Sequence, residues 1–245
     1  MLLRHRSVPR RASFAAARLL TCSLLLALAA PPLAAQAPKA PNIPFEKFTL
    51  PNGLEVILHV DRSVPIVTVN TWYKVGSGDE KPGRTGFAHL FEHIMFMGSE
   101  HVAVGKFDEW LEAAGANNNG STTVDRTNYY ETGPSNALPL MLWLDADRMG
   151  WLLPTMDKPK LDLQRDVVKN ERRQSYDNVP YGRAYETLLP VMFPSTHPYS
   201  WPVIGSLTDL SAGLLTSIDA DVNEQLAAQK FQVPAGQDPT DEQIA

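Results

Sequence analysis

The chain has 245 residues, of which 44% are hydrophobic and 20% are charged, an ordinary composition for a soluble globular protein. It carries 22 Lys and Arg residues against 27 Asp and Glu residues, and this acidic balance predicts no nucleic-acid partner. Its single cysteine, Cys22, excludes a disulfide framework within the chain.

The first 37 residues have the layout of a secretory signal peptide. A basic start is followed by an apolar run over 19–30 and then by small residues. The run is too short and too rich in alanine for a membrane span, so no stable span is expected in the mature chain. Arg10 and Arg11 leave a twin-arginine export route open beside an ordinary Sec leader. We therefore predict a periplasmic or secreted protein, with a Pro/Ala linker over 38–44.

Strand and helix patterns are mixed after the linker. Strands are expected at 48–50, 54–60 and 65–75, with a strand pair within 117–132, and helices at 86–97, 105–114, 135–152 and 158–176. Hairpins outnumber regular βαβ units in this pattern, which favours an α+β fold with a mixed, largely antiparallel sheet packed against helices. We assign the folded domain to 45–212 and a divergent, partly disordered tail to 213–245.

Two histidines of one expected helix carry the strongest chemical signal. His89 and His93 are four residues apart, so both imidazoles project from the same face of a helix and can reach one Zn²⁺. Glu92 lies beside His93, where it can reach a water on the metal without being a ligand. The order H-x-x-E-H is the recognised inverse of the commoner zinc-protease motif. The sequence therefore predicts a zinc site with Glu92 as the general base.

The alternative interpretation is a pair of hydrogen-bonded core histidines. Apolar residues surround the motif on nearly all sides, so this helix is expected to be buried, and its polar groups then need partners that a metal can supply. A catalytic zinc takes three protein ligands and keeps one position open. Glu171 is the best remaining carboxylate for the third ligand, although its charged surroundings also fit a solvated helix residue.

From about Phe48 to Ser206 the chain resembles the pitrilysin/insulinase family, which also contains the mitochondrial processing peptidases. The resemblance rests on stretches that occur in the same order, namely VGS at 75–77, TGFAHLFEH at 85–93, LEAAGANNN at 111–119, DRTNYY at 125–130, DRM at 147–149 and RDVVKNE at 165–171. The metal motif is highly specific when these companions follow it.

The resemblance implies roles for residues outside the motif. Glu171 matches the family's third zinc ligand, and Gln164 stands where many relatives carry a second-shell Glu, which removes a charge near the metal. The family's edge strand, which pairs with an extended peptide substrate, corresponds to Asn119, Gly120, Ser121 and Thr122. The large aromatic residues are interpreted as core side chains, namely Trp72, Tyr129, Tyr130 and Trp201.

The resemblance also implies a second, similar domain that lacks the metal motif and closes over the peptide. The likeness fades after about Ser211, and we interpret the chain as a truncated or altered gene product. We predict a zinc-dependent endopeptidase domain that binds one Zn²⁺ and hydrolyses extended peptides. The alternatives are a zinc-loaded but silent binding or chaperone-like half that needs a partner subunit or second domain, and a misfolding fragment with an open sheet edge.

Overall fold

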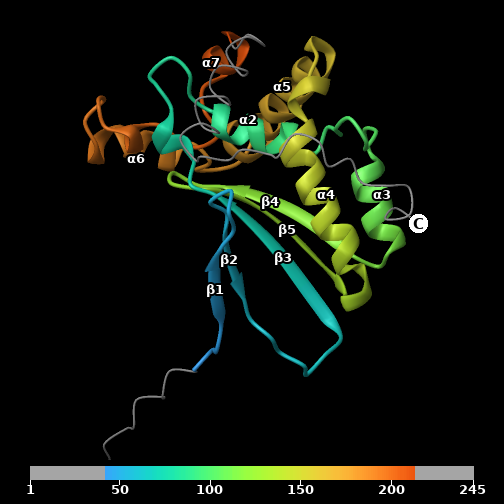
Figure 1. Ribbon diagram of the computed structural model, residues 1–245. Coiled ribbons are helices and arrows are strands. Elements are labelled where there is room, and N and C mark those ends of the chain that lie inside the picture. Colours follow the sequence, from blue (N-terminus) through green and yellow to red (C-terminus); the bar gives the residue numbers. More distant parts are fainter. Residues whose placement is uncertain (1–41, 213–245) are drawn as a thin grey trace, which may run out of the picture. The chain divides into compact units, whose positions relative to one another are not determined.

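The computed structural model describes residues 42–212 (Figure 1). The expected signal peptide and the tail at 213–245 lie outside the described residues, as do residues 38–41 of the linker. Helices and antiparallel strands follow one another without regular βαβ units, so the α+β expectation is confirmed. None of the helices in the described range is long and apolar enough to cross a membrane.

The strands of the described range form two antiparallel sheets. They are β1 (Glu46–Thr49), β2 (Glu55–Leu58), β3 (Ile66–Tyr73), β4 (Asn117–Thr122) and β5 (Thr127–Pro134). Strands β1 and β2 pair as a hairpin, and the second sheet has the order β3-β5-β4. Each of these strands lies within or overlaps a segment in which a strand was expected from the sequence.

The α-helices of the described range cover one side of the three-stranded sheet and extend beyond its end (Figure 1). They are α2 (Phe87–Ile94), α3 (Lys106–Ala113), α4 (Leu138–Trp151), α5 (Lys158–Arg172), α6 (Ala184–Met192) and α7 (Leu207–Ala212). Helices α2 to α5 match the expected ones, and α5 continues into a π-helix over Arg173–Asp177. Helices α6 and α7 were not expected from the sequence, because α6 contains Pro190 and α7 has only six residues.

The two faces of the three-stranded sheet have different neighbours. Val67 and Val69 of β3 face the helices, whereas Thr68 on the other face meets Thr132 across the strands, with their hydroxyl oxygens 2.9 Å apart. Trp72 points to this second face and is 61% exposed, so its assignment to the core was wrong. Its neighbour there is Arg126, whose guanidinium lies 5.1 Å from the centre of the indole ring.

Tyr129 of β5 lies at the centre of the larger of two hydrophobic clusters, where it is 1% exposed as the core interpretation requires. Tyr130 and Trp201, by contrast, are only half-buried. Helices α2 and α5 contribute four of the eight other buried members of this cluster, which are Leu90, Ile94, Met95, Leu152, Leu161, Val168, Ile204 and Leu210. The motif helix is therefore anchored by apolar packing, and its histidines share that helix with core residues.

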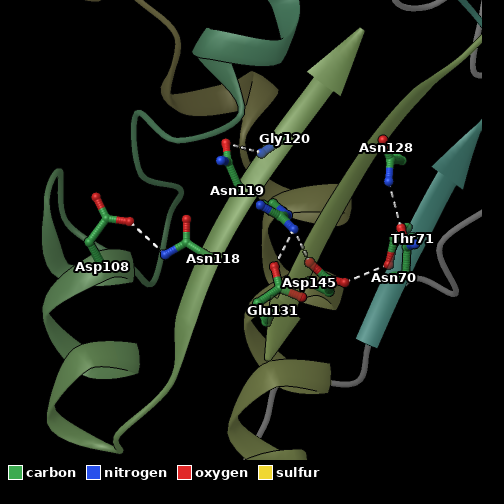
Figure 2. A network of polar contacts seen from close by, with 10 residues as sticks. Asn70, Thr71, Asp108, Asn118, Asn119, Gly120, Asn128, Glu131 and Asp145 are labelled. Carbon is green, nitrogen blue, oxygen red and sulfur yellow. Dashed lines mark hydrogen bonds and ion pairs between the residues drawn. The ribbon is translucent and has the colours of Figure 1, made fainter. Parts of the chain in front are cut away.

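A buried ionic cluster lies between β5 and α4 (Figure 2). The guanidinium of Arg148 donates to Glu131 at 2.7 Å and to Asp145, and Asp145 also accepts a 2.5 Å hydrogen bond from Thr71. All three charged residues are nearly inaccessible to water, and Arg148 stacks 4.6 Å above the ring of Tyr129. Burial raises the pKa of Glu131. These charges stay in the interior because each has a partner there.

Candidate metal centre

The helix that carries the motif is capped by a side chain of the loop that precedes it. Its N-cap residue, Gly86, has φ of 89° and no side chain to accept from the first free N–H groups. The carboxylate of Glu80 does so instead, accepting from Gly86 N at 3.0 Å and from Ala88 N at 2.8 Å. Burial raises the pKa of Glu80 to about 8, against the opposing effect of these hydrogen bonds. Glu80 thus fixes the start of α2.

His89 and His93 lie one turn apart on α2, as their spacing predicts. Their Nε2 atoms are 3.3 Å apart, and the two rings meet edge to face with centroids separated by 4.8 Å. Both side chains are mostly buried, with 12% and 23% of their surface exposed. The two nitrogens therefore point toward one spot at the edge of the core.

Glu171 reaches the same spot from the last turn of α5. Its Oε2 lies 3.3 Å from Nε2 of His93 and 3.7 Å from Nε2 of His89. Ligand atoms of a tetrahedral zinc with bonds of about 2.0–2.1 Å are about 3.3–3.4 Å apart, so the three atoms have the spacing that zinc requires. Within residues 42–212, no other cluster of His, Cys, Asp or Glu offers three potential ligand atoms this close together.

The charge states of these side chains also suit a metal. Burial lowers the pKa of His89 to about 4, so its imidazole is neutral near pH 7 and keeps a lone pair free. A hydrogen bond with His93 is the main cause that lowers the pKa of Glu171, which keeps this carboxylate ionised. A neutral imidazole and an ionised carboxylate are the forms in which these residues bind zinc.

Glu92 lies outside this group of three and faces β4. Its Oε2 accepts a hydrogen bond from the hydroxyl of Thr122, and its carboxyl group packs against Gly120. A Cβ on Gly120 would lie 3.0 Å from Oε1 of Glu92, so a side chain at this position would require the carboxyl group to shift slightly. Burial is the main cause that raises the pKa of Glu92. The carboxyl group is thus oriented by contacts on one side.

The segment expected to bind peptide forms β4, which is an edge of its sheet in the described range. Asn119 accepts from the backbone N–H of Gly120 at 2.8 Å (Figure 2), and Ser121 accepts from the side chain of Arg126 through its backbone oxygen at 2.9 Å. Asn118, one residue earlier, donates to Asp108 of α3. The strand is therefore held by side chains of α3 and of the loop that joins β4 to β5. Substrate binding by these residues stays a prediction.

Gln164 lies on α5, two turns before Glu171. Its amide donates to Sδ of Met97 at 2.7 Å, just beyond the C-terminal end of α2. Nδ1 of His89 is buried and has no hydrogen-bond partner among residues 42–212. The outer-shell role of Gln164 therefore stays a prediction, and the contact seen here joins α5 to the end of the motif helix.

Two contacts at this site were not expected from the sequence. Glu80 precedes Gly86 by a loop of turn residues, and no periodic pattern relates the two. Thr122 was assigned to peptide binding, which stays a prediction, and the contact of its hydroxyl with Glu92 was not expected. A Thr next to an expected strand end carries no signal for such a contact, because the contact depends on how α2 packs on the sheet.

An α+β domain in which an H-x-x-E-H helix faces a carboxylate from a second helix has the architecture of the inverted-motif zinc peptidases. The family model described as insulinase, peptidase family M16, matches residues 55–195. The chain belongs to this metallopeptidase family.

Relatives and solved structures agree with that assignment. The zinc protease PqqE of Helicobacter pylori is 33% identical over 174 residues, which is 71% of this chain and 38% of the relative. A protease from Helicobacter pylori superposes with a TM-score of 0.70 at 32% identity, over 73% of this chain and 42% of that one. The first half of the periplasmic protease PqqL from Escherichia coli has the same fold, with a TM-score of 0.64 at 18% identity, over 79% and 47% of the two chains. The chain thus spans about two fifths of the curated relative.

Proposed function

We propose that this chain is a zinc-dependent endopeptidase domain that cleaves extended peptides. The observation that carries the proposal is the convergence of Nε2 of His89, Nε2 of His93 and Oε2 of Glu171 within 4.8 Å of one another. These three residues would hold the metal through those atoms. When bound, zinc supplies Lewis-acid activation of a water molecule and of the scissile carbonyl.

Glu92 is assigned the proton transfers of the reaction. Its carboxylate takes a proton from the attacking water and then gives it to the leaving amine. Burial raises the pKa of Glu92, which brings this carboxyl group closer to the range in which it can both accept and return a proton. The hydrogen bond from Thr122 occupies Oε2 and leaves Oε1 as the proton acceptor.

The peptide is assigned to the outer edge of β4. An extended peptide that adds to this edge gains backbone hydrogen bonds with little demand on its sequence. The face of β4 that carries Gly120 already contacts the carboxyl group of Glu92. A peptide on this edge would therefore bring its carbonyl groups close to the proposed base.

A second candidate function is a zinc-loaded half that cleaves only together with another domain or subunit. The solved structure of PqqL that this chain resembles is named as the first half of a protease, and the chain spans 38% of its relative PqqE. In this case the partner supplies the remaining contacts to the substrate. Loss of even one donor to the transition state typically costs about 10²–10³ in rate.

The location and extent of the domain are also proposals. PqqL is named as periplasmic, and we place this chain in the periplasm or outside the cell, with a leader at 1–37, a linker at 38–44 and the peptidase domain at 45–212. Sequencing the N-terminus of the exported protein tests this division. A start close to residue 38 supports it, and an exported chain that retains Met1 contradicts it.

The proposed function is tested by zinc content and cleavage of a quenched, unstructured peptide, on the wild type and on Glu92→Gln. We expect about one zinc per chain in both proteins and cleavage by the wild type alone, with a loss of about 10²–10⁴ in the variant. Zinc in both proteins without cleavage in either supports the second candidate. Folded wild type that binds no zinc overturns both.

A further inference from the structure

Arg172 is the residue next to the proposed zinc ligand Glu171, and its side chain is buried to 5% exposure. Successive residues of a helix point about 100° apart, so Arg172 extends into the protein beside the metal group and not into it. Its Nη1 donates to the backbone oxygen of Gly205 at 2.9 Å, and its Nη2 donates to Oε1 of Glu186 at 2.6 Å. One guanidinium therefore joins the end of α5 to α6 and to the loop before α7.

Gly205 carries this connection to the start of the motif helix. Its backbone lies directly against Gly86, because a Cβ on Gly205 would be 2.3 Å from Cα of Gly86. Both glycines have positive φ, 71° and 89°, a conformation that other residues rarely adopt. The N-cap of α2 and the loop held by Arg172 are thus in backbone contact, with no room for a side chain between them.

The same loop and the first turn of α7 hold the residue before the N-cap. Asp209 accepts from the backbone N–H of Thr85 at 3.0 Å and from its hydroxyl at 2.6 Å, and the hydroxyl of Thr85 accepts from Ser206 N at 3.0 Å. The start of α2 is therefore fixed to residues 205–209, and Arg172 fixes that segment to α5. The segment bridges the two helices that supply all three proposed zinc ligands.

We propose that Arg172 is a positioning residue that sets the spacing between α2 and α5 and thereby the affinity of the site for zinc. The inference rests on the proposed function, because it takes His89, His93 and Glu171 as the ligands. The spacing of two ligands on α2 is fixed within that helix, but their distance from Glu171 depends on how the two helices pack. A planar guanidinium with two fixed donor directions defines such packing better than a flexible ammonium does.

The test uses Arg172→Met and Arg172→Lys, with Arg173→Met as the matched control. Arg173 is the next residue along the chain, but it is exposed, and its side chain donates to Asn170 within the same helical segment. Zinc affinity is measured by competition with a chromophoric chelator, at a temperature where the metal-free variants remain folded by circular dichroism. The visible spectrum of the cobalt(II)-loaded protein reports the ligand geometry independently.

We expect Arg172→Met and Arg172→Lys to lower zinc affinity about tenfold or more and to shift the cobalt spectrum, while Arg173→Met matches the wild type in both. Glu186→Gln keeps the shape of the acceptor but removes its charge, and it should weaken zinc binding in the same direction. If Arg172→Met does not fold, the zinc affinity and cobalt spectrum of Glu186→Gln test the inference in its place.

Two results overturn the inference in distinguishable ways. In the first, the folded variants keep the zinc affinity and the cobalt spectrum of the wild type, even if their melting temperature is lower. Arg172 then has only a structural role, and the proposed function stays intact. A folded wild type that binds no zinc would instead remove the proposed function and the inference together.

Discussion

Gly120 lies so close to Glu92 that a side chain at this position would compete with the carboxyl group for space. A Cβ there would be 3.0 Å from both Cγ and Oε1 of Glu92. The same carboxyl group is bonded by Thr122 on its other oxygen. The strand assigned to peptide binding therefore also orients the proposed general base.

Substitutions at Gly120 should consequently impair catalysis in proportion to their size. A methyl group in Gly120→Ala can be accommodated by a small movement of Glu92, whereas the branched side chain of Gly120→Val must displace it. We expect the rate of peptide cleavage to fall modestly in Gly120→Ala and about 10²-fold in Gly120→Val. A small misplacement of a catalytic group typically lowers the rate by a factor of that order.

Zinc content should stay at about one per chain in both variants, because the three atoms nearest to a Cβ at Gly120 all belong to Glu92 and none to a proposed ligand. Steady-state cleavage of a quenched peptide and metal analysis of the same samples check this. Equal activity of Gly120→Val and the wild type would show that Glu92 is not positioned by β4.

Removing the carboxylate of Glu171 should weaken zinc binding strongly. The loss of a contact one step removed from a metal typically costs 10–100-fold in affinity, so Glu171→Gln should cost more than about 100-fold. Asp166→Asn is the control, because this carboxyl group is on the same helix but 76% exposed. Chelator competition measures both affinities, and equal losses in the two variants would exclude Glu171 as a ligand.

Glu80 should make the stability of the metal-free protein depend on pH. Its pKa is about 8 in the folded protein against a usual value of 4.5, so folding favours the protonated form. Its contribution to the free energy of unfolding is therefore fully present below about pH 4.5 and is lost as the pH rises through about 8. Glu80→Gln removes this dependence, so the wild type should lose stability relative to the variant between pH 5 and 9.

Urea unfolding at several pH values measures this difference. Glu112→Gln, which changes an exposed carboxyl group of α3, serves as the control and should follow the wild type. Parallel curves for the wild type and Glu80→Gln would show that Glu80 is ionised in the folded protein throughout this range.

The free energy of unfolding should depend strongly on Arg148, the cation of the buried ionic cluster between β5 and α4. Arg148→Met leaves Glu131 and Asp145 buried without their common partner (Figure 2), and breaking a buried ion pair in this way costs about 3–5 kcal/mol. The exposed Arg173→Met should change the free energy of unfolding by no more than about 0.5 kcal/mol. Urea titration compares the two, and similar values for both would indicate that the buried carboxyl groups need no cation.

The features that the sequence by itself determined are local ones. The spacing of His89 and His93 places them on one face of α2 because helical geometry is regular, and Asn52 with Gly53 marks the β1–β2 turn, where Asn52 accepts from the backbone of Leu54 and Gly53 has φ of 90°. Glu171 was the best remaining carboxylate for the third ligand, and the resemblance to a family supported that choice. Neither source indicated that Trp72 would be exposed, since alternation along β3 shows that two faces exist but not which of them the helices cover.

Only the tertiary structure decided which distant groups meet. Glu171 comes to 3.3 Å from His93 because α2 and α5 pack together, and Glu80 reaches the N-terminus of α2 because its loop folds back. The contacts of Arg172 depend in the same way on a segment more than thirty residues further along the chain. Periodicity records which face of a helix is apolar, but the partners of buried polar groups follow from the packing of whole elements, and no local pattern encodes that packing.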